Sequence, residues 1–181
     1  MTTLTLDNLD ARYHTLFELL GPRKPQVVAF KDYIERETSW LTAPASTRFH
    51  LNIERGLLLH SVGVTYNALG IGGLLAPDVP DESVVIAALF HDLGKVGYPG
   101  KPYYLRNDVQ WEVTKRNMTY KVNPETTMNR AVRSLYLISS RIELSEDEAQ
   151  AQAIVAPDGL CQVAAGGVAS LDHHHEDADC R

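Results

Sequence analysis

Residues 84–95 read VVIAALFHDLGK, a run of seven apolar residues followed by a histidine, an aspartate and, two positions later, a glycine. Asp81 is a favourable N-cap shortly before this run, and Gly94 is a typical helix end. A helix that is apolar on all sides is usually buried in a core. The sequence therefore predicts a buried helix that carries His91 and Asp92 close to its end and stops at Gly94.

A second apolar helix is predicted upstream, from Gly56 to Leu69, where His60 and Asn67 are the main polar side chains. The connection between the two helices, residues 70–80, is rich in glycine and proline. Two neighbouring helices of the core therefore each bury side chains of the kind that bind metal ions.

His60, His91 and Asp92 must be considered together. A single histidine in an apolar helix is more often a hydrogen-bonded core residue than a ligand. Burying two imidazoles and a carboxylate costs several kcal/mol unless an ion pair or a metal ion compensates. Neither helix contains a Lys or Arg that would neutralise Asp92. The combination therefore favours a metal site.

The donor atoms indicate which ion would bind. Imidazole nitrogen with carboxylate oxygen suits Zn, Mn, Fe, Co or Ni better than Ca or Mg, although Mg is possible. Adjacent side chains on a regular helix diverge by about 100°. His91 and Asp92 can therefore reach one ion only near a helix end, which Gly94 is expected to provide.

The rest of the chain also has mainly helical patterns. We expect a helix from Asp7 to Leu20 and one from Pro25 to Trp40. A capping box at Ser145–Glu148 should open a helix that continues to Ile154. In the expected helix over residues 128–142, the core candidates are Val132, Leu135, Tyr136 and Ile138.

Residues 102–122 break the helical pattern. Short strands are expected at residues 103–105, 111–113 and 118–122, with turns at residues 107–108 and 116–117. The predicted fold is a mainly α helical bundle with a short β-like excursion around residues 102–122.

The bulk composition bounds the possible functions. With 181 residues, 44% of them hydrophobic, the chain has the size of a single domain, residues 1–181. A net charge of −6 argues against general nucleic-acid binding. The chain has only two cysteines and no run that resembles a signal peptide or a membrane span. These features favour a location in the cytoplasm without membrane association. The apolar pattern ends before residues 160–181, which we expect to be an irregular or altered C-terminal segment.

Two stretches resemble the leading motifs of the HD-domain phosphohydrolases, which follow the order H…HD…D. They are residues 55–61 (RGLLLHS) and residues 89–95 (LFHDLGK), and the likeness is greatest to compact HD proteins encoded by phages. The resemblance implies a helical bundle around one or two divalent ions that activate water for attack on a phosphate ester. It implies that His60, His91 and Asp92 are metal ligands, and that Asp92 also takes a proton from the nucleophile.

Other site residues follow from the same resemblance. Lys95 and Arg55 are candidate contacts of the substrate phosphate, and this role would make Lys95 a catalytic residue. Lys95 could equally be an exposed cation at a helix end. Tyr103 and Tyr104 could stack on a base or simply pack the excursion against the bundle. His50 is a candidate for indirect support of the site or for binding a second ion.

The family's closing aspartate has several candidates near the C-terminus. Asp179, preceded by Ala178, matches the local pattern and is our prediction for the last metal ligand. Asp158 and a residue of a neighbouring subunit are alternatives. The three histidines at residues 173–175 could also bind metal, but such runs more often do so adventitiously.

We therefore expect hydrolysis of a nucleotide, a deoxynucleoside mono- or triphosphate, in the cytoplasm, or in the host cytoplasm if a phage encodes the protein. A cyclic-nucleotide phosphodiesterase of the same fold is one alternative. The other is a degenerate HD protein that binds a nucleotide or a partner without catalysis, which Pro157 favours because relatives have a histidine there. A homo-oligomer is possible.

Overall fold

The computed structural model describes residues 3–154 and confirms the mainly α fold with a short β excursion. Both small antiparallel sheets lie between the fourth and sixth helices. The elements are the 3₁₀ helix Leu6–Asn8, α1 (Leu9–Leu16), the 3₁₀ helix Phe17–Leu19, α2 (Lys24–Glu37), α3 (Gly56–Leu75), α4 (Asp81–Leu89), the 3₁₀ turn Leu93–Val96, β1 (Gly97–Tyr98), β2 (Lys101–Pro102), β3 (Tyr104–Arg106), α5 (Gln110–Arg116), β4 (Tyr120–Val122), α6 (Arg130–Ser139) and α7 (Glu146–Ile154).

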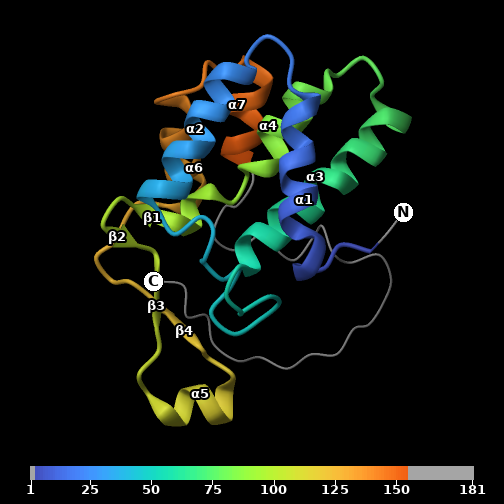
Figure 1. The fold of residues 1–181 in the computed structure, drawn as a ribbon. Coiled ribbons are helices and arrows are strands. Elements are labelled where there is room, and N and C mark those ends of the chain that lie inside the picture. Colours follow the sequence, from blue (N-terminus) through green and yellow to red (C-terminus); the bar gives the residue numbers. More distant parts are fainter. Residues whose placement is uncertain (1–2, 155–181) are drawn as a thin grey trace, which may run out of the picture.

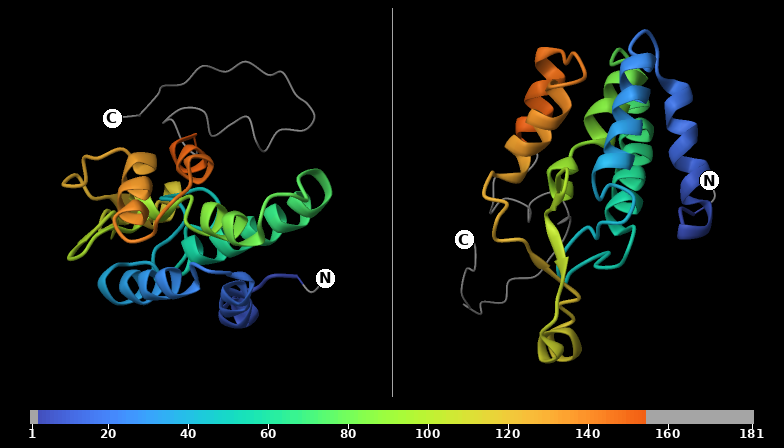
Figure 2. Two further views of the ribbon diagram at one scale, coloured as in Figure 1. Left: turned by 90° about the horizontal axis from the view of Figure 1, so that it is seen from above. Right: turned by 60° about the vertical axis from the view of Figure 1, so that its left-hand side comes forward.

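The larger helices, labelled in Figure 1, form three layers. Helices α1 and α2 lie on one side, α3 and α4 form the middle, and α6 and α7 lie on the other side, as the left view of Figure 2 shows. Helix α3 packs along α4, and α7 packs on both α4 and α6. The 3₁₀ turn after α4 packs against α6. The end of α4 therefore lies between the two outer layers.

Buried aromatic side chains hold the end of α4. The Phe90 ring meets the Phe30 ring of α2 edge to face, with 5.2 Å between centroids, and lies 6.1 Å from the Trp40 ring. All three side chains are buried. Trp40 donates a hydrogen bond from Nε1 to the Tyr13 hydroxyl at 3.0 Å, which satisfies its polar atom. Because Phe90 is anchored in this cluster, the position of its neighbour His91 is restricted as well.

The first two helices differ from the prediction at their ends. Asp7 lies inside the 3₁₀ helix Leu6–Asn8 instead of capping a helix. Helix α2 begins one residue before Pro25, which fits there because the first turn of a helix leaves its N–H groups unpaired. It ends at Glu37, so Trp40 lies beyond it although its side chain is buried as predicted.

Helix α3 continues six residues further than predicted, to Leu75. Glycine lowers helix propensity by only about 1 kcal/mol, so glycines within residues 70–75 weaken the helix without ending it. Helix α3 also has the length and apolar composition of a membrane span, with 28% of that window buried. The capping box is confirmed: Ser145 Oγ accepts from the Glu148 N–H at 3.2 Å, and Glu148 Oε2 accepts from the Ser145 N–H at 2.9 Å.

The excursion projects from one end of the bundle (Figure 1). Strand β3 pairs with β4 with Leu105 opposite Lys121, which agrees with two of the predicted strands. The third was wrong, because residues 111–113 lie in helix α5. Asn107 accounts for the difference: its Oδ1 accepts from the Val109 N–H at 3.1 Å and its Nδ2 donates to Glu112 Oε2 at 2.8 Å, which supports a helical turn there.

Helix α6 bears out part of the predicted core face. Ile138 is buried as predicted and Leu135 is half-buried, but Val132 and Tyr136 are more than half exposed, whereas Arg133 and Ser134 are buried. The prediction was wrong for Val132 and Tyr136 because apolar residues were assumed to face inward. Here the inward face instead contacts the polar backbone of the turn after α4.

Candidate metal centre

The chain leaves the helical conformation where it carries the two adjacent candidate ligands. Helix α4 ends at Leu89, earlier than the predicted end at Gly94. Phe90 and Asp92 have φ and ψ near −100° and +10°, outside the regular helix. The 3₁₀ turn then begins at Leu93. The side chains of His91 and Asp92 therefore need not diverge as they would on a regular helix. Both can reach one ion only where the helix has ended, as predicted from the sequence.

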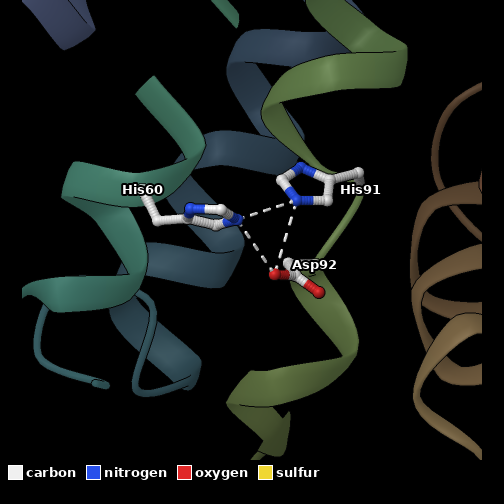
Figure 3. Close-up of side chains that lie close together, drawn as sticks. All are labelled: His60, His91 and Asp92. Carbon is white, nitrogen blue, oxygen red and sulfur yellow. Dashed lines mark hydrogen bonds and ion pairs between the residues drawn. The ribbon is translucent and has the colours of Figure 1, made fainter. Parts of the chain in front are cut away.

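Three ligand atoms form a nearly equilateral triangle (Figure 3). Nε2 of His60, from α3, lies 3.2 Å from Nε2 of His91, and each of these nitrogens lies 3.4 Å from Oδ2 of Asp92. A tetrahedral ion bound at about 2.0–2.1 Å requires ligand atoms roughly 3.3–3.4 Å apart, since a tetrahedron's edge is about 1.6 times its centre-to-corner distance. The geometry of these residues therefore fits such an ion.

A hydrogen bond to the backbone fixes the tautomer of His91 that can bind a metal ion. Its Nδ1 lies 2.7 Å from the carbonyl oxygen of Ala88. A carbonyl can only accept a hydrogen bond, so Nδ1 carries the proton and a neutral His91 presents the lone pair of Nε2 to the triangle. A second hydrogen bond of this kind is common for histidines that bind metal ions.

Lys95 neutralises Asp92, for which no cationic partner was predicted from the sequence. Its Nζ lies 2.7 Å from Oδ2 of Asp92, and both side chains are only 11% exposed. Lys95 is thus a buried partner of Asp92, not an exposed cation at a helix end. Burial alone would raise the pKa of Asp92, but the contacts with His60 and His91 and the charge of Lys95 hold that pKa well below its usual range.

This contact corrects one step of the sequence analysis. Asp92 has a cationic partner within the described part of the chain, so its burial alone does not require a metal ion. The case for a metal rests instead on the three converging ligand atoms. His60 is the most accessible of the three, with 25% of its side chain exposed.

Helix α6 holds the turn that carries these ligands. Ser134 Oγ accepts from the Gly94 N–H at 2.7 Å and donates to the His91 carbonyl at 3.1 Å. Arg133 donates from Nη1 to the Gly94 carbonyl at 2.6 Å. A Cβ at Gly94 would overlap the Arg130 carbonyl, so only glycine allows this close approach. Ser134 and Arg133 were not predicted from the sequence, because buried polar side chains on an amphipathic helix have no local signature.

His50 lies beside the triangle. Its ring is 5.3 Å from that of His60, centroid to centroid. Desolvation, followed by the charges of His60 and Lys95, lowers the pKa of His50 and favours the neutral imidazole. His50 therefore lies close enough to support the site or to bind a second ion, and its role stays a prediction.

The candidate substrate contacts have other partners in the structure. Arg55 forms an ion pair with Asp10 of α1. The rings of Tyr103 and Tyr104 meet edge to face at 4.8 Å. Burial raises the pKa of the Tyr104 phenol, whose hydroxyl lies 3.4 Å from the Ala45 carbonyl. The roles of Arg55, Tyr103 and Tyr104 in substrate binding stay predictions.

An apolar groove of about 600 Å³ reaches His91. Ile71 and Leu75, on its rim, are 57% and 80% exposed. Exposed apolar surface of this extent commonly contacts a ligand or another segment of protein. The groove lies between α3, α4 and α7, and its lining includes Val64, Ala68, Ile71, Leu75, Val84, Ala87, Ala88, His91 and Ala151.

The predicted closing ligand, Asp179, lies outside the described residues, as do Asp158, Pro157 and residues 160–181. Comparisons with protein-family models, with curated proteins and with solved structures found no match to this chain. The inference of function therefore depends on the three converging ligand atoms and on the motif resemblance.

Proposed function

We propose that the protein is a metal-dependent phosphohydrolase acting on a nucleotide, such as a deoxynucleoside mono- or triphosphate. The observation that carries the proposal is the triangle of two imidazole nitrogens and one carboxylate oxygen, with sides of 3.2–3.4 Å. The order of these residues in the chain, and the motifs around them, resemble the HD-domain phosphohydrolases. Zn, Mn, Fe, Co and Ni suit this donor set, and Mg is a weaker candidate.

Each residue has a defined task in this proposal. His60 and His91 bind the ion through Nε2, and Asp92 binds it through Oδ2. The low pKa of Asp92 keeps its carboxylate ionised at neutral pH. The Lys95 ammonium, which lies at the same oxygen, is placed to contact a substrate phosphate. A divalent ion held there would lower the pKa of coordinated water and polarise a phosphoryl oxygen.

The test is a substrate and metal screen. Metal-free protein is reloaded with Mn, Co, Ni, Zn or Mg and assayed for release of phosphate, pyrophosphate and triphosphate from nucleotides, with cyclic nucleotides included for the phosphodiesterase alternative. Asp92→Asn should abolish turnover. Asp78→Asn, at an exposed position before α4, is the matched control and should match wild type. No turnover by wild type with any ion would overturn the proposal.

The ion pair between Lys95 and Asp92 favours a second candidate, a nucleotide-binding protein of the same fold without catalysis. In that case the ammonium alone neutralises the carboxylate, and the cluster holds no ion. Metal analysis separates the two candidates. A stoichiometric transition metal, retained in wild type and lost in Asp92→Asn, supports the enzyme, whereas nucleotide binding by metal-free protein that takes up no ion supports the second candidate.

A further inference from the structure

The hydroxyl of Ser134 bridges both ends of the turn that carries the ligands. It donates to the carbonyl of His91 at 3.1 Å and accepts from the N–H of Gly94 at 2.7 Å. Ser134 is 1% exposed, so water does not compete for either hydrogen bond. A hydroxyl is one of the few side-chain groups that can donate and accept at a single atom.

This bridge acts on a short segment of backbone. The two groups it joins belong to residues three positions apart, and Asp92 lies between them. Within the turn, the N–H of Leu93 donates to the Phe90 carbonyl at 3.0 Å, and that of Lys95 donates to the Asp92 carbonyl at 2.9 Å. The carbonyl of His91 instead receives the Ser134 hydroxyl. Ser134 therefore occupies a position where a continued helix would have placed a backbone bond.

We propose that Ser134 is a positioning residue for the metal centre, because its bridge holds His91 and Asp92 at the angle that lets both reach one ion. The inference rests on the proposed metal-dependent function. On a regular helix these two side chains would diverge by about 100°. The bridge stabilises the non-helical turn that brings Nε2 and Oδ2 to 3.4 Å.

Arg133 supports the same segment at a different atom. It donates to the Gly94 carbonyl at 2.6 Å, and its guanidinium lies 5.3 Å from the Tyr98 ring and 5.0 Å from the Tyr103 ring. Arg133 therefore ties the turn to the excursion, whereas Ser134 contacts the backbone of a ligand residue directly. Loss of the Ser134 hydroxyl leaves the Arg133 anchor in place, so Ser134→Ala should fold.

The experiment compares Ser134→Ala with Ser61→Ala. Ser61 is equally buried and directly follows His60, but its hydroxyl has no hydrogen-bond partner within residues 3–154. Both variants lose the same atom next to the centre, and only one loses the bridge. Co²⁺ is titrated into each metal-free protein, and its affinity and visible spectrum are recorded. Crystal structures of metal-free wild type and Ser134→Ala report the spacing of the ligand atoms.

In Ser134→Ala we expect a helical protein whose Co²⁺ affinity falls roughly tenfold or more, with an altered spectrum, as for other partners of metal-binding residues. Ser61→Ala should match wild type. An unchanged affinity and spectrum in Ser134→Ala would overturn the inference. If wild type binds neither Co²⁺ nor any other ion of the screen, the proposed function fails. The crystal structures then decide on Ser134: the inference requires the His91–Asp92 spacing to widen, and an unchanged spacing contradicts it.

Discussion

Glu148 of α7 should contribute measurable stability at neutral pH. Its carboxylate receives two hydrogen bonds from Arg23, Nη1 to Oε2 at 2.6 Å and Nη2 to Oε1 at 2.7 Å. Burial alone would raise the pKa of Glu148, but these bonds, with hydrogen bonds from the Ser83 side chain and the Ser145 backbone, lower it from 4.5 to about 2. Arg23 also pairs with Glu82 of α4 at 3.0 Å. The network therefore fastens α7 to the helix that leads to the metal centre.

The sign and size of the effect follow from the pKa. A folded-state pKa below the unfolded value stabilises the protein fully above about pH 4.5, and the contribution is lost as the pH falls toward 2. The difference of about 2.5 units corresponds to at most about 3.5 kcal/mol, at about 1.4 kcal/mol per pKa unit. Because Arg23 is 22% exposed, solvent screens the pair. We expect about 1–3 kcal/mol.

Glu148→Gln tests this contribution, because glutamine can still complete the capping box with Ser145 while it removes the charge. The free energy of unfolding is measured in urea at pH 7, 5, 4 and 3. The variant should be less stable than wild type at pH 7, and the difference should shrink below about pH 4.5. Glu146→Gln, at an exposed position of the same helix, is the control. Equal stability at pH 7, or a difference of constant size down to pH 3, would refute the reasoning.

Three further predictions concern the centre. Asp92→Ala should lose metal and hydrolysis together while circular dichroism stays helical; wild-type turnover in this variant would contradict the ligand assignment. Lys95→Met should lower kcat/KM and leave metal content near normal if Lys95 contacts phosphate, whereas unchanged kinetics would exclude that contact. Asp179→Ala should weaken metal affinity more than Asp177→Ala does, as measured by metal titration, and equal affinities in both variants and wild type would exclude Asp179 as the closing ligand.

The apolar pattern predicted most of the helical core. Uninterrupted apolar runs identified α3 and α4 as helices of the core. The prediction that α3 is buried holds only for its first half, because Ile71 and Leu75 near its end are exposed. Helix ends were harder to predict, since α3 continues through glycines to Leu75 and α4 stops at Leu89. These ends depend on tertiary contacts, such as those of Phe90 with α2, which a local pattern does not contain.

The convergence of His60, His91 and Asp92 could be inferred from the sequence, because two apolar helices that each contain ligand types tend to pack together. The charge balance was not predicted, because Lys95 was placed beyond the expected helix end at Gly94. Side chains three positions apart often meet, and Lys95 does reach Asp92 in the structure.

The polar contacts that shape the centre come from residues far away in the sequence. Ser134 and Arg133 lie about forty positions after the backbone groups that they bind. Their value for the fold is that each satisfies a backbone group which the end of α4 would otherwise leave buried without a partner. Apolar burial therefore decides which helices enclose the ligands, whereas these hydrogen bonds decide the direction in which His91 and Asp92 point. For that reason the turn, rather than the core, should be the part of this site most sensitive to conservative substitution.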